Sequence, residues 1–218
     1  MKIYEFKLNE AYLKRFFPES RVKSKAQIIE ILMESINYMM LNPNVADDKI
    51  QGKIILIKDK MSRLFFFKDK KYYSIVFPFF VTYDDGTYSF SFKNKIDIDG
   101  QLSSKIISII NCNDFKSDCS IDFFSPICEE EQCDENFWLF LRELLLMEDG
   151  YVRYDFDQEN YDKFKKMGEE HKHPLNHYDL FYSNDVTFKI GLEKTLTEDE
   201  FINFMNINTN CLYLKKVK

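Results

Sequence analysis

All three histidines of this 218-residue chain lie within EEHKHPLNHYD, at residues 169–179. An imidazole titrates near neutral pH, so it can give or accept a proton in catalysis, and it is also a common metal ligand. His171 and His173 are two residues apart and would share one face of an extended segment. His177 follows beyond Pro174. The stretch therefore indicates two kinds of chemistry, metal binding and proton transfer.

Metal binding would require the imidazoles to converge, usually together with a carboxylate. Zinc or manganese at His171, His173 and His177 is one interpretation. Neighbouring acidic side chains could add oxygen ligands: Glu169, Glu170 and Asp179. A turn at Pro174 would instead point the rings apart and leave a polar loop. We expect no cofactor here and keep the zinc or manganese site as the alternative.

Proton transfer suits metal-free cleavage of a phosphodiester. That reaction needs a base for the attacking hydroxyl, an acid for the leaving oxygen and a cation for the developing negative charge. The alternating stretch YVRYDFD, residues 151–157, places Arg153 and Asp155 on one strand face. Arg153 would bind phosphate and Asp155 would orient a histidine. The predicted catalytic residues are Arg153, Asp155, His173 and His177, and the predicted substrate-binding residues are Tyr178 and Lys189.

A purely structural role is the alternative for the same residues. Arg153 with Asp155 would then be an ordinary cross-strand ion pair. His173 would cap a turn, and His171 would be solvated.

The elements that must position these residues begin with a helix. SKAQIIEILMESINYMMLN, residues 24–42, has apolar residues at helical spacing, and Ser24 with Gln27 forms a capping-box pattern. From Gly52 the pattern changes to short runs rich in aromatic and β-branched residues, GKIILIKD and RLFFFKD, which indicate strands. Residues 71–95 then read as one long hairpin that turns at Asp85-Gly86.

The second half of the chain continues in the same mixed way. Further strand texture at residues 119–126 precedes an acidic loop and a helix over 134–150, in which Asp134 is the expected cap. The strand at 151–157, a polar segment and two strands around residues 183–185 follow. A final helix begins at Thr197.

The order of these elements predicts an α+β fold, an antiparallel sheet meander packed by helices. We expect a single domain over 1–218, with a helical and hairpin part at about 1–126 and a motif-bearing part at about 127–218. Glycine-rich phosphate loops, the dinucleotide fingerprint and the G-x-S-x-G elbow are missing from the sequence. P-loop hydrolysis, Rossmann redox chemistry and the usual serine hydrolase arrangement therefore lose support.

Composition favours a cytoplasmic protein with no membrane contact. The sequence has no apolar run of membrane-spanning length and no apolar signal segment at its start. Its five cysteines form no C-x-x-C pair, which favours reduced thiols over a zinc site. The net charge is −6, yet residues 1–75 carry +6. That basic third could contact nucleic acid or an acidic partner, or be neutralised within the domain.

The order VRYDFD, a polar loop and HPLNHYDLFYSNDVTFKIGL resembles an uncharacterised bacterial family of about this length, over roughly residues 134–214. Members of that family carry an R-x-D strand, an H-P-x-x-H block and a short hairpin. A looser likeness links the chain to small bacterial toxins that target RNA. The matching positions are Arg153, Tyr154, Asp155, His173 and His177, although the toxins space their histidines more closely as H-x-H.

These likenesses imply a protein of a defence or toxin–antitoxin module that acts on nucleic acid, as a nuclease with a His/Arg/Asp site. The alternative is a non-catalytic subunit that binds nucleic acid or a protein partner encoded nearby. Its contact surfaces would be the acidic stretch Glu129–Glu131 and the helix at 24–42. A small-molecule enzyme that uses zinc is a third interpretation.

Overall fold

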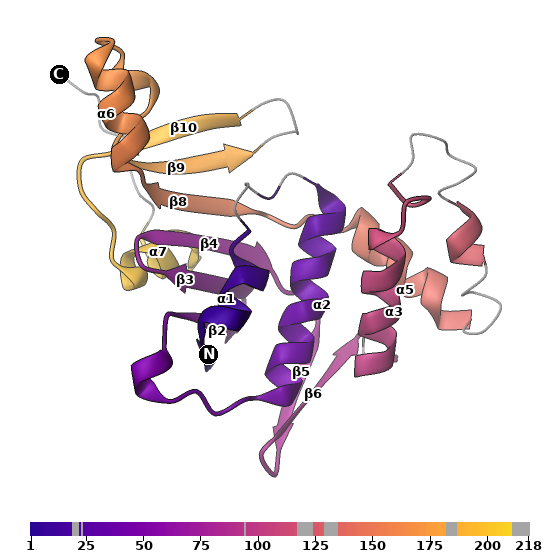
Figure 1. Cartoon of the computed structure of the whole chain (residues 1–218). Coiled ribbons are helices and arrows are strands. Elements are labelled where there is room, and N and C mark those ends of the chain that lie inside the picture. The colour runs from indigo at the N-terminus through magenta and orange to yellow at the C-terminus, as the bar shows by residue number, and fades with distance from the viewer. Residues whose placement is uncertain are drawn as a thin grey trace. The chain divides into compact units, whose positions relative to one another are not determined.

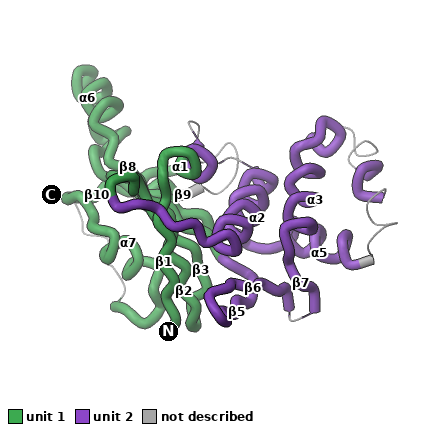
Figure 2. Tube along the Cα trace, turned by 60° about the horizontal axis from the view of Figure 1, so that its bottom comes forward, with its two compact units in different colours: residues 1–13, 48–76, 150–218 green, residues 14–47, 77–149 purple. Residues whose placement is uncertain are grey.

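The computed structural model describes residues 1–18, 22, 24–93, 95–116, 124–128, 135–181 and 187–210. The fold is α+β, as predicted. The chain forms two compact units, drawn in green and purple in Figure 2. Unit 1 holds residues 1–13, 48–76 and 150–218, and unit 2 holds residues 14–47 and 77–149. Segments of the two units alternate along the chain.

Unit 1 is built on a sheet whose described strands run in the order β1-β2-β3-β4-β8-β9-β10 (Figure 1). All neighbouring strands in it are antiparallel. The strands are β1 (Lys2–Leu8), β2 (Gly52–Lys58), β3 (Ser62–Lys68), β4 (Lys71–Val76), β8 (Val152–Phe156), β9 (Asn176–Phe181) and β10 (Thr187–Leu192). The aromatic and β-branched runs of β2 and β3 explain their strand conformation, because such side chains pack well on a pleated surface.

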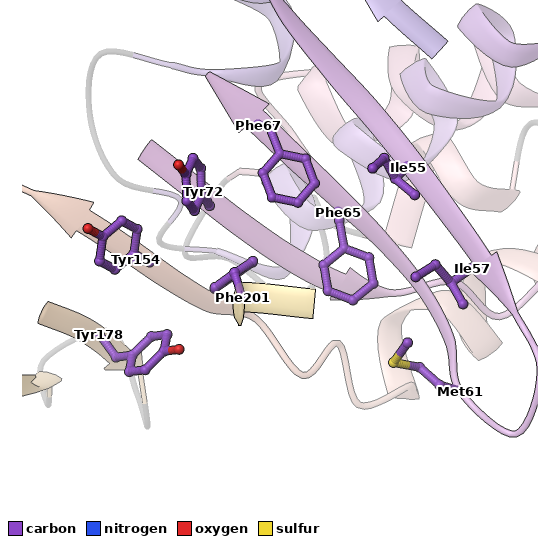
Figure 3. Packing of buried hydrophobic residues seen from close by; sticks show 9 residues of the cluster. All are labelled: Ile55, Ile57, Met61, Phe65, Phe67, Tyr72, Tyr154, Tyr178 and Phe201. Carbon is purple, nitrogen blue, oxygen red and sulfur yellow. The ribbon is translucent and has the colours of Figure 1, made fainter. Parts of the chain in front are cut away.

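One face of this sheet carries an aromatic core. Its buried side chains come from five strands, a turn and one helix, and Figure 3 shows them: Ile55, Ile57, Met61, Phe65, Phe67, Tyr72, Tyr154, Tyr178 and Phe201. Helix α7 (Glu198–Met205) contributes Phe201, which is fully buried. The Phe201 ring lies 6.1 Å from the ring of Phe65 and 5.8 Å from that of Tyr72. The predicted capping box of Thr197 and Glu200 begins this helix.

Unit 1 also contains helix α6 (Gln158–Lys166) and the 3-10 turn η2 (Glu170–Lys172). A second 3-10 turn, η1 (Asp47–Lys49), begins one residue before the segment 48–76 of this unit. The segment around α6 was expected only to be polar. Asp157 explains the helix, because its carboxylate accepts a hydrogen bond from the backbone N–H of Asn160 at 3.0 Å. Helix α1 (Glu10–Phe16) crosses from the first segment of unit 1 into unit 2.

Unit 2 combines helices with a second antiparallel sheet in the order β5-β6-β7. Its elements are α2 (Lys25–Leu41), β5 (Phe80–Asp84), β6 (Thr87–Phe92), β7 (Ile96–Ile98), α3 (Gly100–Asn111) and α5 (Glu135–Leu146). Ser24 and Gln27 form the predicted capping box of α2. The α2 helix packs against α3, α5 and β6.

The long hairpin predicted over residues 71–95 is wrong in its first arm. Its turn is correct, because Asp85 and Gly86 both have positive φ, 45° and 82°, as a type I′ turn requires. The strand before the turn is interrupted, however. Strand β4 ends at Val76 and belongs to unit 1, whereas β5 begins at Phe80 in unit 2. Pro78 lies in this gap. Proline has no backbone N–H, and in the gap no hydrogen bond between strands requires one.

Several predicted features fall outside the described residues. They are residues 119–123 of the predicted strand at 119–126, the acidic loop with Glu129–Glu131, the cap Asp134 and the turn at 183–185. The rest of that predicted strand is wrong, because residues 124–128 are helical. Cys112 and Cys128 are free thiols, and the other three cysteines are also outside the described part. None of the helices in the described ranges is both long and apolar enough for a membrane span.

Replacing Phe201 by alanine should lower the free energy of unfolding by about 3–5 kcal/mol, because it empties the centre of the aromatic core. Urea denaturation followed by circular dichroism measures the loss. Phe188→Ala is the control, since that side chain is 51% exposed in the same unit and its loss should cost under about 0.5 kcal/mol. Equal costs for the two variants would show that α7 does not close the core.

Candidate functional site

Charged side chains gather on the other face of the sheet, where β8, β9 and β10 run side by side (Figure 1). In the strand register Arg153 lies opposite Asp179, and Asp155 lies opposite His177. Lys189 on β10 lies opposite Asp179 from the other side. Directly opposed residues of antiparallel strands share a face, and so do residues two apart along a strand. These five residues therefore form one group, called the charged cluster below.

Asp179 is the centre of the charged cluster. Arg153 Nη2 donates to Asp179 Oδ2 at 2.6 Å and lies equally close, 2.6 Å, to Asp155 Oδ2. Lys189 Nζ donates to Asp179 Oδ1 at 2.6 Å. Burial alone would raise the pKa of Asp179, but the hydrogen bond from Lys189 and the charges of Arg153 and Lys189 outweigh it and lower the pKa. Asp179 is therefore a buried carboxylate with a cation on each oxygen.

His177 is held by hydrogen bonds at both ring nitrogens. Nδ1 lies 2.7 Å from the carbonyl oxygen of Pro174, and Nε2 lies 2.8 Å from Lys189 Nζ. A carbonyl can only accept and an ammonium can only donate, so Nδ1 carries the proton and Nε2 accepts. Burial, followed by the charge of Lys189, lowers the pKa of His177. The ring is therefore neutral at pH 7, with its basic nitrogen facing the cluster.

Gly191 makes room for this arrangement. It lies opposite His177 on β10, and a Cβ atom there would come within 3.0 Å of the Pro174 ring. At such a short distance the Pro174 ring would have to move away. The missing side chain lets Pro174 lie over the sheet with its carbonyl oxygen against His177.

The cations and the acids of the cluster differ in exposure. The side chains of Asp155, His177 and Asp179 are 9%, 0% and 5% exposed, whereas those of Arg153 and Lys189 are 23% and 26% exposed. The solvent-facing part of the cluster is therefore positive, and the acids and the imidazole lie beneath it. Burial alone would lower the pKa of Arg153, but the nearby acids, Asp155 first among them, raise it.

Tyr151 lies beside the cations. Burial raises the pKa of its phenol to about 12, although the charge of Arg153 opposes the shift. Its ring centroid is 5.7 Å from that of Tyr73, the β4 residue opposite Arg153. Arg153 is thus flanked by aromatic rings where the cluster meets β4.

His173 lies next to the charged cluster but has its own partner. Its Nε2 is 2.9 Å from Asp157 Oδ2, and its ring stacks on Phe164 of α6 at 5.7 Å. The ring centroids of His173 and His177 are 4.9 Å apart. Burial would raise the pKa of Asp157, but hydrogen bonds from Asn160 and His173 lower it overall. Asp157 thus ties the start of α6 to the histidine segment.

The structure brings together most of the residues predicted as a site. Arg153, Asp155, His177 and Lys189 are members of the cluster, and His173 contacts it through His177. Tyr178 does not join them. It points to the opposite face, where its ring stacks on Phe204 at 4.3 Å and burial raises the pKa of its hydroxyl. A side chain between His177 and Asp179 on a strand must face away from both.

The group of potential metal ligands differs from the three histidines of the sequence. Among the described residues, the side chains close enough to share an ion are Asp155, His177 and Asp179. This group and the predicted triple have only His177 in common, since His171 is exposed and His173 binds Asp157.

The sequence pattern did not predict the contacts of two acidic residues, Asp179 in the charged cluster and Asp157 beside His173. The sequence pattern suggests Asp179 only as an oxygen ligand, although its spacing from His177 places it on the same strand face as that histidine. The sequence pattern gave Asp157 no role in the predicted site. Its position just before QENYDKFKK is the signal for a helix cap, and that cap brings its carboxylate to His173.

Comparisons of the chain with protein-family models, with curated proteins and with solved structures find no match. The resemblance to a bacterial family and to RNA-targeting toxins therefore stays a prediction.

The ion pair of Asp179 and Lys189 should be strongly coupled. Asp179→Asn leaves two cations without their shared acceptor and should cost about 3–5 kcal/mol of unfolding free energy. Lys189→Met completes a double-mutant cycle. The unfolding free energy lost in the double variant should be smaller than the sum of the two single losses by about 1–3 kcal/mol. Urea denaturation of the four proteins measures this term.

The matched control is the exposed pair of Glu169 and Lys172, 2.5 Å apart. Glu169→Gln should cost less than about 1 kcal/mol. Additive effects of Asp179→Asn and Lys189→Met would mean that the contact between them contributes nothing.

Proposed function

We propose that this protein cleaves phosphodiester bonds in nucleic acid at the charged cluster. The observation that carries the proposal is the layering of the cluster. Two partly exposed cations, Arg153 and Lys189, lie over a neutral imidazole and two buried carboxylates. The cations suit a phosphate group, and the buried groups beneath hold these cations in place by hydrogen bonds and ion pairs.

Phosphate binding follows from the chemistry of the exposed layer. A guanidinium and an ammonium both bind phosphate oxygens, and they act most strongly where water is partly excluded. Lys71 extends the positive layer across the sheet. It lies opposite Asp155 on β4 and is exposed. Cations on β4, β8 and β10 thus form a row across one face, as a phosphate backbone would require.

The cleavage step needs a proton acceptor and charge stabilisation. An oxygen of water, or a hydroxyl of the sugar, forms a bond to phosphorus while the bond from phosphorus to the leaving sugar oxygen breaks. The proton of the nucleophile passes to solvent water, because the imidazole and the carboxylates beneath the cations are buried, and the leaving oxygen takes up a proton from solvent. Arg153 and Lys189 stabilise the extra negative charge on the phosphoryl oxygens in the transition state.

The charge of the units supports a polyanionic substrate at unit 1. Unit 1 has twenty Lys and Arg against seventeen Asp and Glu, a net +3, whereas unit 2 has ten against nineteen, a net −9. The positive balance therefore lies on the unit that carries the cluster. Together with the resemblance to RNA-targeting toxins, this supports nucleic acid over a small phosphate ester.

The same resemblance leads us to propose a defence or toxin–antitoxin setting. In that setting the active protein would damage the nucleic acid of its own cell or of an invading phage. Induced expression of the wild-type protein in a bacterium should arrest growth, and expression of Lys189→Met should not. Equal growth with both proteins would argue against a toxin.

A non-catalytic role is the second candidate. It is favoured by the burial of His177, whose side chain is 0% exposed, and by the internal pairing of the cations with Asp155 and Asp179. In that case the cluster would fix the register of β8–β10, and the positive row would bind nucleic acid without cutting it. Binding measured by fluorescence anisotropy, with no cleavage, would support this role.

The proposal is tested by incubating the purified protein with single-stranded and double-stranded RNA and DNA. We expect cleavage of one of them and a loss of about 100-fold in rate for Lys189→Met, because a cation on the transition state is removed. Lys194→Met is the control, since Lys194 pairs with Glu200 on the surface and is 69% exposed. Its rate should equal that of the wild type. Intact substrates with the wild-type protein, under a range of metals and pH values, would remove the nuclease proposal.

A further inference from the structure

We infer that the charged cluster also binds one divalent metal ion, with Asp155, His177 and Asp179 as its ligands. The binding rests on geometry alone, whereas a part for the ion in cleavage rests on the function proposed above.

The three ligands are already gathered. Each offers one ligand atom, and these atoms lie within 4.8 Å of one another. His177 Nε2 and Asp179 Oδ1 are 3.8 Å apart. Ligand atoms lie about 2.0–2.2 Å from a small divalent ion, so neighbouring ligands of one ion are about 3–4 Å apart. Small rotations of the two carboxylates would therefore close the site without movement of the strands.

An oxygen of Asp155 points independently to a missing ligand. Oδ2 lies close to Arg153, but Oδ1 is buried and has no hydrogen-bond partner among the residues that the structure describes. The Asp155 side chain is 9% exposed, so water hardly reaches it. A carboxylate oxygen buried in this way loses its hydration without compensation. A bound cation would supply the interaction that this oxygen lacks.

His177 is better suited to ligation than to direct proton transfer. A general base must reach the nucleophile, but this ring is fully buried. A metal ligand can be buried, and metal-bound histidines usually donate their other ring N–H to a carbonyl or a carboxylate. The bond from Nδ1 to the Pro174 carbonyl has this form and leaves Nε2 for the ion.

Lys189 now occupies the position that the ion would take. Its ammonium lies 2.8 Å from His177 Nε2 and 2.6 Å from Asp179 Oδ1. The lysine stem is flexible and partly exposed, so an ion can displace the ammonium toward solvent, where it would meet a phosphate. A mixed set of two carboxylates and one imidazole suits Mn²⁺ or Zn²⁺. The ion would add positive charge beside the reacting phosphate.

The test is a titration of the full chain with Mn²⁺ alone, without nucleic acid, by isothermal calorimetry. We expect one site per chain. Lys189→Met removes the competing cation and should tighten binding about tenfold. Asp155→Asn removes a ligand and should weaken it by at least about tenfold. The control is His171→Gln, which changes an exposed histidine outside the cluster and should leave affinity unchanged.

Two results would overturn the inference. One is the lack of saturable binding of Mn²⁺, Zn²⁺ or Mg²⁺ to the folded wild-type protein. The other is a metal affinity of Lys189→Met that is equal to or weaker than that of the wild type. This variant tests the inference even where Asp155→Asn does not fold. Tight metal binding without cleavage would reject the nuclease proposal but not the metal site. Cleavage that persists in EDTA, with no metal binding, would reject the metal site but not the nuclease proposal.

Discussion

The carboxylate of Asp179 is charged although its side chain is buried. The arrangement of β8, β9 and β10 places a cation against this charge from each side. One oxygen accepts from Lys189 on β10 and the other from Arg153 on β8. A buried charge without such partners would cost several kcal/mol, by the usual estimate of about 3–5. The strands on both sides of β9 must therefore keep their present register. A slip by one residue would turn every cation to the aromatic face and every tyrosine to the charged one.

The two faces of this part of the sheet support each other. Tyr154 and Tyr178 alternate with the charged residues and pack into the aromatic core beside Phe201. Tyr154 is also anchored by its hydroxyl, which donates to Asn176 Oδ1 at 2.9 Å. The rigid packing on one side holds the backbone from which Arg153, Asp155 and Asp179 project on the other. Positions fixed in this way favour a binding or catalytic role, because they do not reorganise when a charged ligand arrives.

Local patterns in the sequence predicted part of this well. Alternation in YVRYDFD placed Arg153 and Asp155 on one face, and the capping patterns at Ser24 and Thr197 marked real helices. Long-range pairing could not be predicted. No local signal says that β4 pairs with β8 rather than continuing through Pro78 into a hairpin. For the same reason the roles of Asp157 and Asp179 depended on knowing which strands and turns lie next to them.

The pairing of β4 with β8 also sets the order in which the chain can be completed. Residues 77–149 form most of unit 2 and separate the two strands in the sequence. On the ribosome, β4 therefore waits without its neighbour while that long insertion is synthesised, and closing so large a loop makes the pairing a late event. All five members of the charged cluster lie on strands made after this point. A nascent chain therefore lacks the whole charged cluster until β8, β9 and β10 have been made. Under the proposed nuclease function, it would not cleave the messenger and ribosome that are making it.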